Sequence, residues 1–188
     1  MLGSEGEENK FWVRYLPNEV NESQNYNEYC VIKLRNIEVI DDNNFCGGYY
    51  SIGKENGTVK NFSNLHFKGW TNHGIPKNFV KVYKLYRMLM ESNPKQPILI
   101  HCPNGVTRTG TLALIIHIID TINEFHSFNP LNNLTILRRH RYGAVPGIDQ
   151  FMLCLGVVYE HFNQELMKSE KQIYKKFLEI YDLLLIEK

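Results

Sequence analysis

Apolar positions in the first seventy residues follow the patterns of short strands joined by turns. Residues 29–39 are rich in Val, Ile, Leu and Tyr, which is typical of a strand, and residues 49–52 resemble a second one. The Asn56-Gly57 pair lies between short extended stretches and predicts a hairpin turn. Residues 65–70 are a further strand candidate. This part of the chain is therefore expected to be strand-rich.

The pattern changes to helical spacing from Pro76 onwards. Pro76 suits the first position of a helix over residues 76–92, whose apolar positions recur every three or four residues. The apolar run 97–100 predicts a strand buried on both faces in a parallel sheet. Later helices are expected at residues 108–123, 131–141 and 148–166, with an amphipathic segment at 168–187. Strands followed by helices favour an α/β or α+β domain.

Composition excludes several classes of protein. The 188 residues, 43% hydrophobic and 22% charged, suit a single globular domain. A net charge of +1 argues against a nucleic-acid partner. The best apolar run, residues 112–119, is shorter than the about 18 residues of a membrane helix. The N-terminus lacks the basic and apolar regions of a secretory signal, so a cytoplasmic location without membrane attachment is expected.

The four cysteines show neither a disulfide framework nor a metal site. Cys30, Cys46, Cys102 and Cys154 form no Cys-x-x-Cys pair and have no histidines at zinc spacing. They are expected to be reduced thiols, three of them structural.

The segment ILIHCPNGVTRTG, residues 98–110, carries the most chemical information. A tight loop that leads into a helix N-terminus points successive backbone N–H groups at one place, which favours a bound oxyanion. The same positive environment lowers the pKa of a thiol such as Cys102 at the start of the loop. Arg108, six residues after Cys102, is able to fork two N–H donors onto a phosphate. A thiolate below a clamped tetrahedral anion suits phosphoryl transfer to sulfur.

These residues resemble the signature His-Cys-x5-Arg-(Ser/Thr)-Gly of the protein tyrosine phosphatases. Three further segments, in the same order and spacing, resemble other parts of the tyrosine-specific branch. HFKGWTNHGIP (66–76) is similar to its acid loop, KFWVRYLPNE (10–19) to its lysine-containing segment, and RYGAVPGIDQF (141–151) to its glutamine loop. The resemblance implies a central mixed, twisted sheet flanked by helices, with the phosphate loop between a buried strand and a helix. It also implies phosphotyrosine-containing proteins as partners, and neither metal nor organic cofactor.

The resemblance assigns roles residue by residue. Cys102 is the nucleophile that forms a phosphocysteine intermediate, and Arg108 clamps the phosphate. Thr109 supplies a hydroxyl that helps the thiolate leave, and His101 tunes the thiolate. The implied substrate-binding residues, besides Arg108, are Lys10, Trp70, Pro103, Asn104, Gly105, Val106, Thr107 and Gln150.

The sequence departs from the family pattern at two catalytic positions. Asn72 stands where the acid loop has its Asp, and an amide cannot protonate the leaving tyrosine oxygen. General acid catalysis contributes a factor of about 10²–10⁴, so turnover is expected to be slow unless His73 replaces the acid. Pro146 aligns with the glutamine that orients the hydrolytic water, which leaves Gln150 a partial role. Within the phosphate loop, Asn104 and Thr107 replace a small Ala and a Gly.

Two main hypotheses of function remain open at this stage. One is a tyrosine phosphatase with impaired catalysis; the other is a pseudophosphatase that traps or shields phosphoproteins. A third, weaker hypothesis is a degenerate fragment with neither role. The divergent, Asn-rich character is similar to tyrosine phosphatase-like proteins of parasitoid-wasp polydnaviruses, for which the setting is the host-cell cytoplasm.

The resemblance also predicts how the chain is organised. Residues 1–9 are expected to be a flexible N-terminus, and residues 10–166 a tyrosine phosphatase domain that lacks its front part. Residues 167–188 are expected to form an amphipathic helix packed on the domain. An incomplete domain leaves a sheet edge and some core exposed, so self-association is expected.

Overall fold

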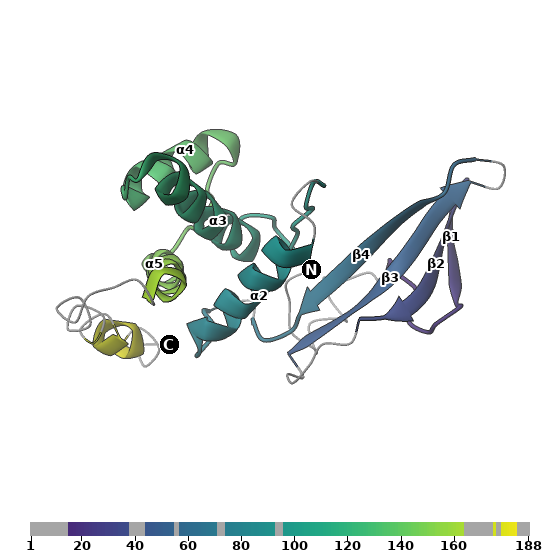
Figure 1. Cartoon of the computed structure of the whole chain (residues 1–188), viewed down its shortest axis with the longest axis horizontal. Helices are drawn as coiled ribbons and strands as arrows, with labels where there is room; N and C mark the ends of the chain where they lie inside the picture. The colour runs from purple at the N-terminus through teal and green to yellow at the C-terminus, as the bar shows by residue number, and fades with distance from the viewer. Residues whose placement is uncertain are drawn as a thin grey trace. The chain divides into compact units, whose positions relative to one another are not determined.

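The computed structural model describes residues 15–37, 44–54, 57–70, 74–92, 96–163, 175 and 178–183 (Figure 1). The chain divides into two compact units, residues 1–69 and residues 70–188. The described strands all lie in the first unit and the described helices in the second.

The first unit contains a four-stranded sheet in which each strand pairs antiparallel with the next one in sequence. Its strands are β1 (Ser23–Tyr26), β2 (Tyr29–Asn36), β3 (Phe45–Lys54) and β4 (Lys60–Phe67). The turn between β1 and β2 places Asn27 at a φ of 51°, a left-handed conformation that asparagine tolerates. The sheet is therefore a simple meander with β1 and β4 at its edges (Figure 1).

One face of this sheet carries the core of the first unit. Along β2, Val31 and Lys33 are buried whereas Ile32 and Leu34 are exposed, as the two-residue period of a strand requires. The buried Lys33 ammonium donates to the Asn18 carbonyl oxygen at 2.6 Å. Aromatic pairs on β3 and β4 stack across the sheet, Phe45 with Phe67 at 4.9 Å and Tyr50 with Phe62 at 5.4 Å between ring centroids.

The second unit is helical over its described residues. It contains α2 (Phe79–Ser92), α3 (Arg108–Phe125), α4 (Pro130–His140) and α5 (Ile148–Phe162), and residues 178–183 are helical as well. Helix α5 packs against α2 and α3, and α4 packs against α3 (Figure 1). The apolar positions of α3 recur at helical spacing and are buried, so this helix forms the centre of the unit; they are Leu112, Leu114, Ile115, Ile118 and Ile119.

The α+β class is confirmed, but the predicted buried strand at residues 97–100 is wrong. This segment is not a strand, and Leu99 is 87% exposed. A strand is stable only where a neighbour takes up its backbone hydrogen bonds, and the described part of the second unit offers none. Its apolar run alone does not make a strand. The expected mixed sheet is also corrected, because the described strands pair antiparallel throughout.

One helix boundary and one strand differ from expectation for local reasons. Helix α2 begins at Phe79 and not at Pro76, because the Asn78 side chain caps it by accepting the Val80 N–H at 2.9 Å. Strand β1 was not predicted, because its sequence SQNY has no apolar alternation. It is held by the turn to β2.

Several predictions fall outside the described residues. The flexible stretch 1–9, Lys10, Asn72 and His73 lie there, as does most of the C-terminal segment 167–188. In the described portions of the chain, no helix combines the length and apolarity needed to cross a membrane.

Candidate active site

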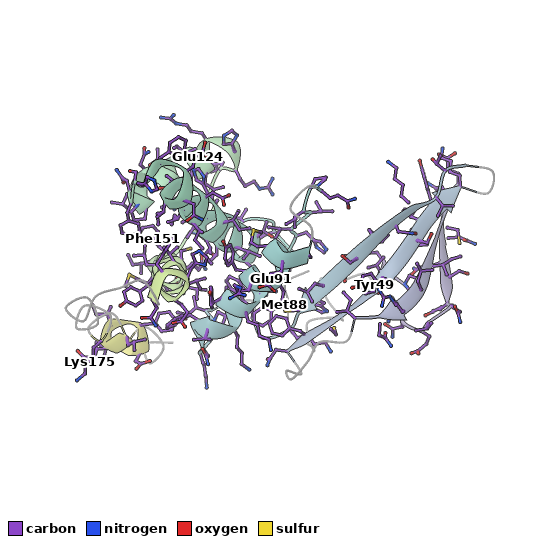
Figure 2. The ribbon with its side chains drawn as sticks, in the orientation of Figure 1. Tyr49, Met88, Glu91, Glu124, Phe151 and Lys175 are labelled. Atoms are coloured by element: carbon purple, nitrogen blue, oxygen red, sulfur yellow. The ribbon has the colours of Figure 1, made fainter. Side chains whose placement is uncertain are left out.

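The phosphate-loop candidate, residues 102–107, leads directly into the N-terminus of α3. Cys102 at its start is 8% exposed, and Arg108, the first residue of α3, is 1% exposed. Figure 2 shows the side chains on the ribbon, with Glu124 labelled near the far end of the same helix. The first N–H groups of α3 have no partner within the helix, so they and the helix dipole favour negative charge at the loop.

The surroundings of Cys102 favour its thiolate. Burial is the largest single effect and by itself raises the pKa of the thiol. Hydrogen bonds from the Thr109 hydroxyl and from the backbone N–H groups of Thr109, Gly105 and Asn104 act in the opposite direction, and the pKa of Cys102 is lowered overall. This arrangement suits a nucleophile at neutral pH.

The side chain of Asn104 folds back into the loop. Its Oδ1 accepts the N–H groups of Val106 at 3.0 Å and Thr107 at 3.2 Å, and it also accepts the Cys102 thiol at 3.4 Å. Its Nδ2 donates to the Thr107 hydroxyl at 3.0 Å. Asn104 thus makes contacts with both ends of the loop.

Arg141 braces the loop from outside and was not predicted as a site residue. Its Nη2 donates to the Asn104 carbonyl oxygen at 3.1 Å, and its Nε donates to the Gly105 carbonyl oxygen at 3.3 Å. Gly105 has a φ of +64°, a left-handed conformation that glycine adopts without strain. The sequence signal for Arg141 is its place at the start of the glutamine-loop resemblance, residues 141–151, which assigned it no role.

The glutamine-loop candidate packs against the phosphate loop. The Val145 N–H donates to the Val106 carbonyl oxygen at 3.3 Å. Arg138 holds this segment by donating to the carbonyl oxygens of Ala144 at 2.9 Å and Val145 at 2.8 Å. Close approach requires the glycine at position 110, where a Cβ would lie 3.1 Å from both the Ala144 Cβ and the Val145 nitrogen. The structure therefore brings together two segments that the sequence singled out separately.

Gln150 has a structural partner at this position. Its side-chain oxygen accepts the Gly147 N–H at 3.3 Å, and the side chain is buried at the N-terminus of α5. This bond helps to cap α5. Pro146 is exposed and has no side-chain donor or acceptor for water.

The described ends of the acid-loop candidate are fixed. Trp70 is fully buried, and its indole N–H donates to the Gly74 carbonyl oxygen at 3.1 Å. The Pro76 carbonyl oxygen accepts the hydroxyl of Tyr181, which is 1% exposed, at 2.8 Å. Tyr181 also makes an edge-to-face contact with Phe79.

The other candidate residue before the loop is His101. Burial lowers the pKa of its imidazole, which favours the neutral ring. For metal binding, no group of three His, Cys, Asp or Glu side chains with suitable proximity occurs within the described ranges.

Comparison with known proteins shows which family the chain belongs to. The family model described as "Protein-tyrosine phosphatase" matches residues 1–160. The chain belongs to the protein-tyrosine phosphatase family. Tyrosine-protein phosphatase non-receptor type 20 of Rattus norvegicus is 31% identical to the chain over 109 residues, 58% of this chain and 26% of the relative. A protein-tyrosine-phosphatase of Arabidopsis thaliana is 28% identical over 99 residues, 51% of this chain and 29% of the relative.

Solved structures show the same fold. The Trypanosoma cruzi protein tyrosine phosphatase superposes with a TM-score of 0.74 at 20% identity, over 86% of this chain and 58% of that one. The Trypanosoma brucei protein tyrosine phosphatase gives 0.75 at 20% identity, over 86% and 59%. The chain thus spans little more than a quarter of these curated relatives and under two thirds of the solved chains. The resemblance to the protein tyrosine phosphatases and their fold class are confirmed.

Proposed function

We propose that this protein tyrosine phosphatase domain acts on phosphotyrosyl proteins through a cysteinyl-phosphate intermediate, with catalysis impaired at the steps that move protons. The Cys102 thiolate attacks phosphorus, the bond from phosphorus to the tyrosine oxygen breaks, and water then releases inorganic phosphate. The observation that supports this most directly is the buried Cys102 at the start of a loop that runs into the N-terminus of α3, where donors from Thr109 and the loop lower the pKa of its thiol. Arg108 at the start of α3 is the proposed clamp on the phosphate oxygens.

The impairment follows from the residues at the other two catalytic positions. The amide of Asn72 cannot donate a proton, so the tyrosine oxygen has to take its proton from water or from His73. Pro146 cannot orient a water molecule, and the carbonyl of Gln150 is engaged by Gly147. Both the formation and the hydrolysis of the cysteinyl phosphate are therefore expected to be slow.

A second candidate function is a phosphotyrosine-binding pseudophosphatase that traps or shields its partners. A retained Cys102 and Arg108 beside an absent acid at position 72 favour binding over turnover, and this observation supports the alternative. Both functions take phosphotyrosine-containing proteins as partners. For both we propose a cytoplasmic setting, with neither nucleic acid nor membrane required.

The deciding measurement is steady-state release of phosphate from a phosphotyrosyl peptide, run beside a Cys102→Ser control. Turnover that the control lacks supports the enzyme. No turnover in folded protein, together with binding of the same peptide, supports the pseudophosphatase. If the protein neither releases phosphate from the peptide nor binds the peptide, both proposals fail.

A further inference from the structure

The phosphate loop has few N–H donors to offer an anion. Pro103 has no N–H, so residues 103–107 supply four. Those of Asn104 and Gly105 act on the Cys102 sulfur. The other two, from Val106 and Thr107, donate to the side-chain oxygen of Asn104. Every N–H group in this part of the loop is therefore engaged by the protein itself.

The Asn104 oxygen lies where a reacting group has to come. It accepts the Cys102 thiol at 3.4 Å, and so it lies about as far from the sulfur as the reacting group of a bound phosphate would. A carbonyl oxygen with partial negative charge, accepting two backbone N–H groups, has the same hydrogen-bonding character as one phosphate oxygen.

The backbone around Asn104 is braced, but its side chain is able to leave. Arg141 holds the carbonyl oxygens of Asn104 and Gly105, so the loop itself is fixed in place. Asn104 is exposed, and rotation about its side-chain bonds moves Oδ1 away without a change in the backbone. An open loop would therefore differ from the observed one in a single side-chain rotamer.

We propose that the Asn104 side chain is an internal ligand of the phosphate loop, which occupies the anion position in the free protein and has to swing out before an oxyanion binds. This inference rests on the proposed function in one respect, that the loop is an anion site. The apparent affinity for an oxyanion is then the intrinsic affinity multiplied by the fraction of molecules with the loop open.

The test is the affinity for inorganic phosphate, measured by isothermal titration calorimetry at neutral pH. Asn104→Ala removes the internal ligand and leaves the N–H groups of Val106 and Thr107 for the anion. Two backbone N–H bonds, the bond from Asn104 Nδ2 to the Thr107 hydroxyl and the contact with the Cys102 thiol all hold the closed state. We therefore expect phosphate to bind about tenfold more tightly to this variant.

The matched control is Asn129→Ala. Asn129 also uses its side-chain oxygen to accept a backbone N–H, that of Asn132 at 3.1 Å, but it does so at the N-terminus of α4. We expect this control to leave phosphate affinity unchanged. Near-ultraviolet circular dichroism of each variant reports whether the second unit remains folded.

A second measurement on the unaltered protein covers the case in which Asn104→Ala does not fold. In a 15N-labelled sample, added phosphate is expected to shift the side-chain amide signals of Asn104 toward those of a solvated amide. The backbone signals of Val106 and Thr107 should shift at the same phosphate concentrations. If the backbone signals shift while the Asn104 side chain keeps its hydrogen-bonded signals, the inference is overturned.

The outcomes separate this inference from the proposed function. Equal phosphate affinity of the unaltered protein and folded Asn104→Ala would overturn the internal ligand and leave the anion site intact. If neither folded protein binds phosphate, the loop is not an anion site and the proposed function fails with it. Tighter binding by Asn104→Ala alone supports the inference.

Discussion

The phosphate-loop candidate differs from the acid-loop and glutamine-loop candidates in how closely its residues follow the family pattern. The loop keeps a buried thiol with a lowered pKa and a buried arginine, Cys102 and Arg108. The acid-loop and glutamine-loop candidates keep their structural anchors, Trp70 and Gln150, but carry Asn72 and Pro146 where the family resemblance expects a general acid and a water-orienting glutamine.

This difference separates two parts of a catalytic site that are usually considered together. Holding an anion requires fixed donors and positive charge, whereas turning it over requires groups that donate protons and orient water. Under the proposed function, the chain retains the residues that hold an anion more fully than those that turn it over. The predictions below test each side of this contrast.

The largest expected effect is on anion binding, through Arg108. Arg108→Ala should weaken binding of a phosphotyrosyl peptide by about 10³-fold, because two charge-assisted hydrogen bonds are lost. Fluorescence polarisation with a labelled peptide measures it. Arg139→Ala, which removes an exposed arginine of α4, is the control and should change binding little. Equal losses of peptide affinity in both variants would mean that Arg108 contributes only to the overall positive charge and not as a specific clamp.

Since Arg108 is buried, its loss also affects folding, and a second variant is needed. Arg108→Lys keeps the charge but loses the planar fork of donors. It should fold and still bind the peptide more weakly than the unaltered protein. Full binding by a folded Arg108→Lys would contradict the clamp.

The next effect concerns the proton-transfer side. Asn72→Asp should raise turnover of a phosphotyrosyl peptide by about 10²-fold or more, since it restores a general acid. Turnover of an aryl phosphate whose leaving group ionises near neutral pH should rise far less. Steady-state phosphate release with both substrates gives the comparison.

Asn132→Asp adds the same charge on the exposed first turn of α4 and serves as the control for Asn72→Asp. It should leave both rates unchanged. A rise with Asn72→Asp that is equal for the two substrates, or no rise in folded protein, would contradict the account of a missing acid.

The sequence predicts this contrast better than it predicts the fold around it. The spacing of Cys102 and Arg108 predicts the loop that leads into α3, because a short loop before a helix sets its own geometry, whereas Asn72 was assigned only from the family resemblance. The prediction of a buried strand at residues 97–100 was wrong, since local composition cannot show whether a partner strand is present, and Leu99 is exposed. Arg141 was missed because its contacts with the loop span 36 and 37 positions in sequence. Neither the acid position nor Lys10 is tested by the described residues.

The thiol environment allows a test by pH. Burial raises the pKa of Cys154, whereas the pKa of Cys102 is lowered despite burial because Thr109 and the loop N–H groups donate to its sulfur. We expect iodoacetamide to modify Cys102 at pH 7 about tenfold faster than an ordinary thiol, which is only a few per cent thiolate there. Cys154 should react only on unfolding. Peptide mass spectrometry identifies the modified residue.

The same lowered pKa has a consequence for stability. Because the pKa of Cys102 is lower in the folded protein than in the unfolded one, its thiolate contributes stability above the unfolded value of about 8.5. That contribution is lost as pH falls through the folded value. Relative to Cys102→Ser, the unaltered protein should gain stability as pH rises through this window. A difference that does not vary with pH would contradict the lowered pKa.

A smaller effect is expected at the brace of the loop. Gly105 and Gly143 both have left-handed φ values, +64° and +73°. A Cβ on Gly105 would lie 2.9 Å from Arg141 Nη2, whereas a Cβ on Gly143 would meet only Val106 Cγ1 at 3.8 Å. Gly105→Ala should therefore cost about 2 kcal/mol in the free energy of unfolding, and Gly143→Ala about 1 kcal/mol. Urea denaturation compares them, and equal costs would mean that Arg141 is not a brace.

The smallest effect is on the anchor of the acid segment. Tyr181→Phe removes the donor to the Pro76 carbonyl oxygen and should lower the free energy of unfolding by about 1 kcal/mol. Burial raises the pKa of Tyr181, so its hydroxyl remains a donor across the neutral range. Tyr142→Phe, at a position 95% exposed, is the control and should have no effect.

Phosphate affinity should be the same in Tyr181→Phe as in the unaltered protein, because the hydrogen bond that this variant removes is made to Pro76 at the end of the acid segment and not to the loop residues 102–107. Turnover of a phosphotyrosyl peptide by Asn72→Asp, in contrast, should fall when Tyr181→Phe is added, since a restored acid works only from a fixed position. The opposite result would be a loss of phosphate affinity in Tyr181→Phe with no loss of turnover when it is added to Asn72→Asp. That result would mean that the bond from Tyr181 to Pro76 supports anion binding and not proton transfer.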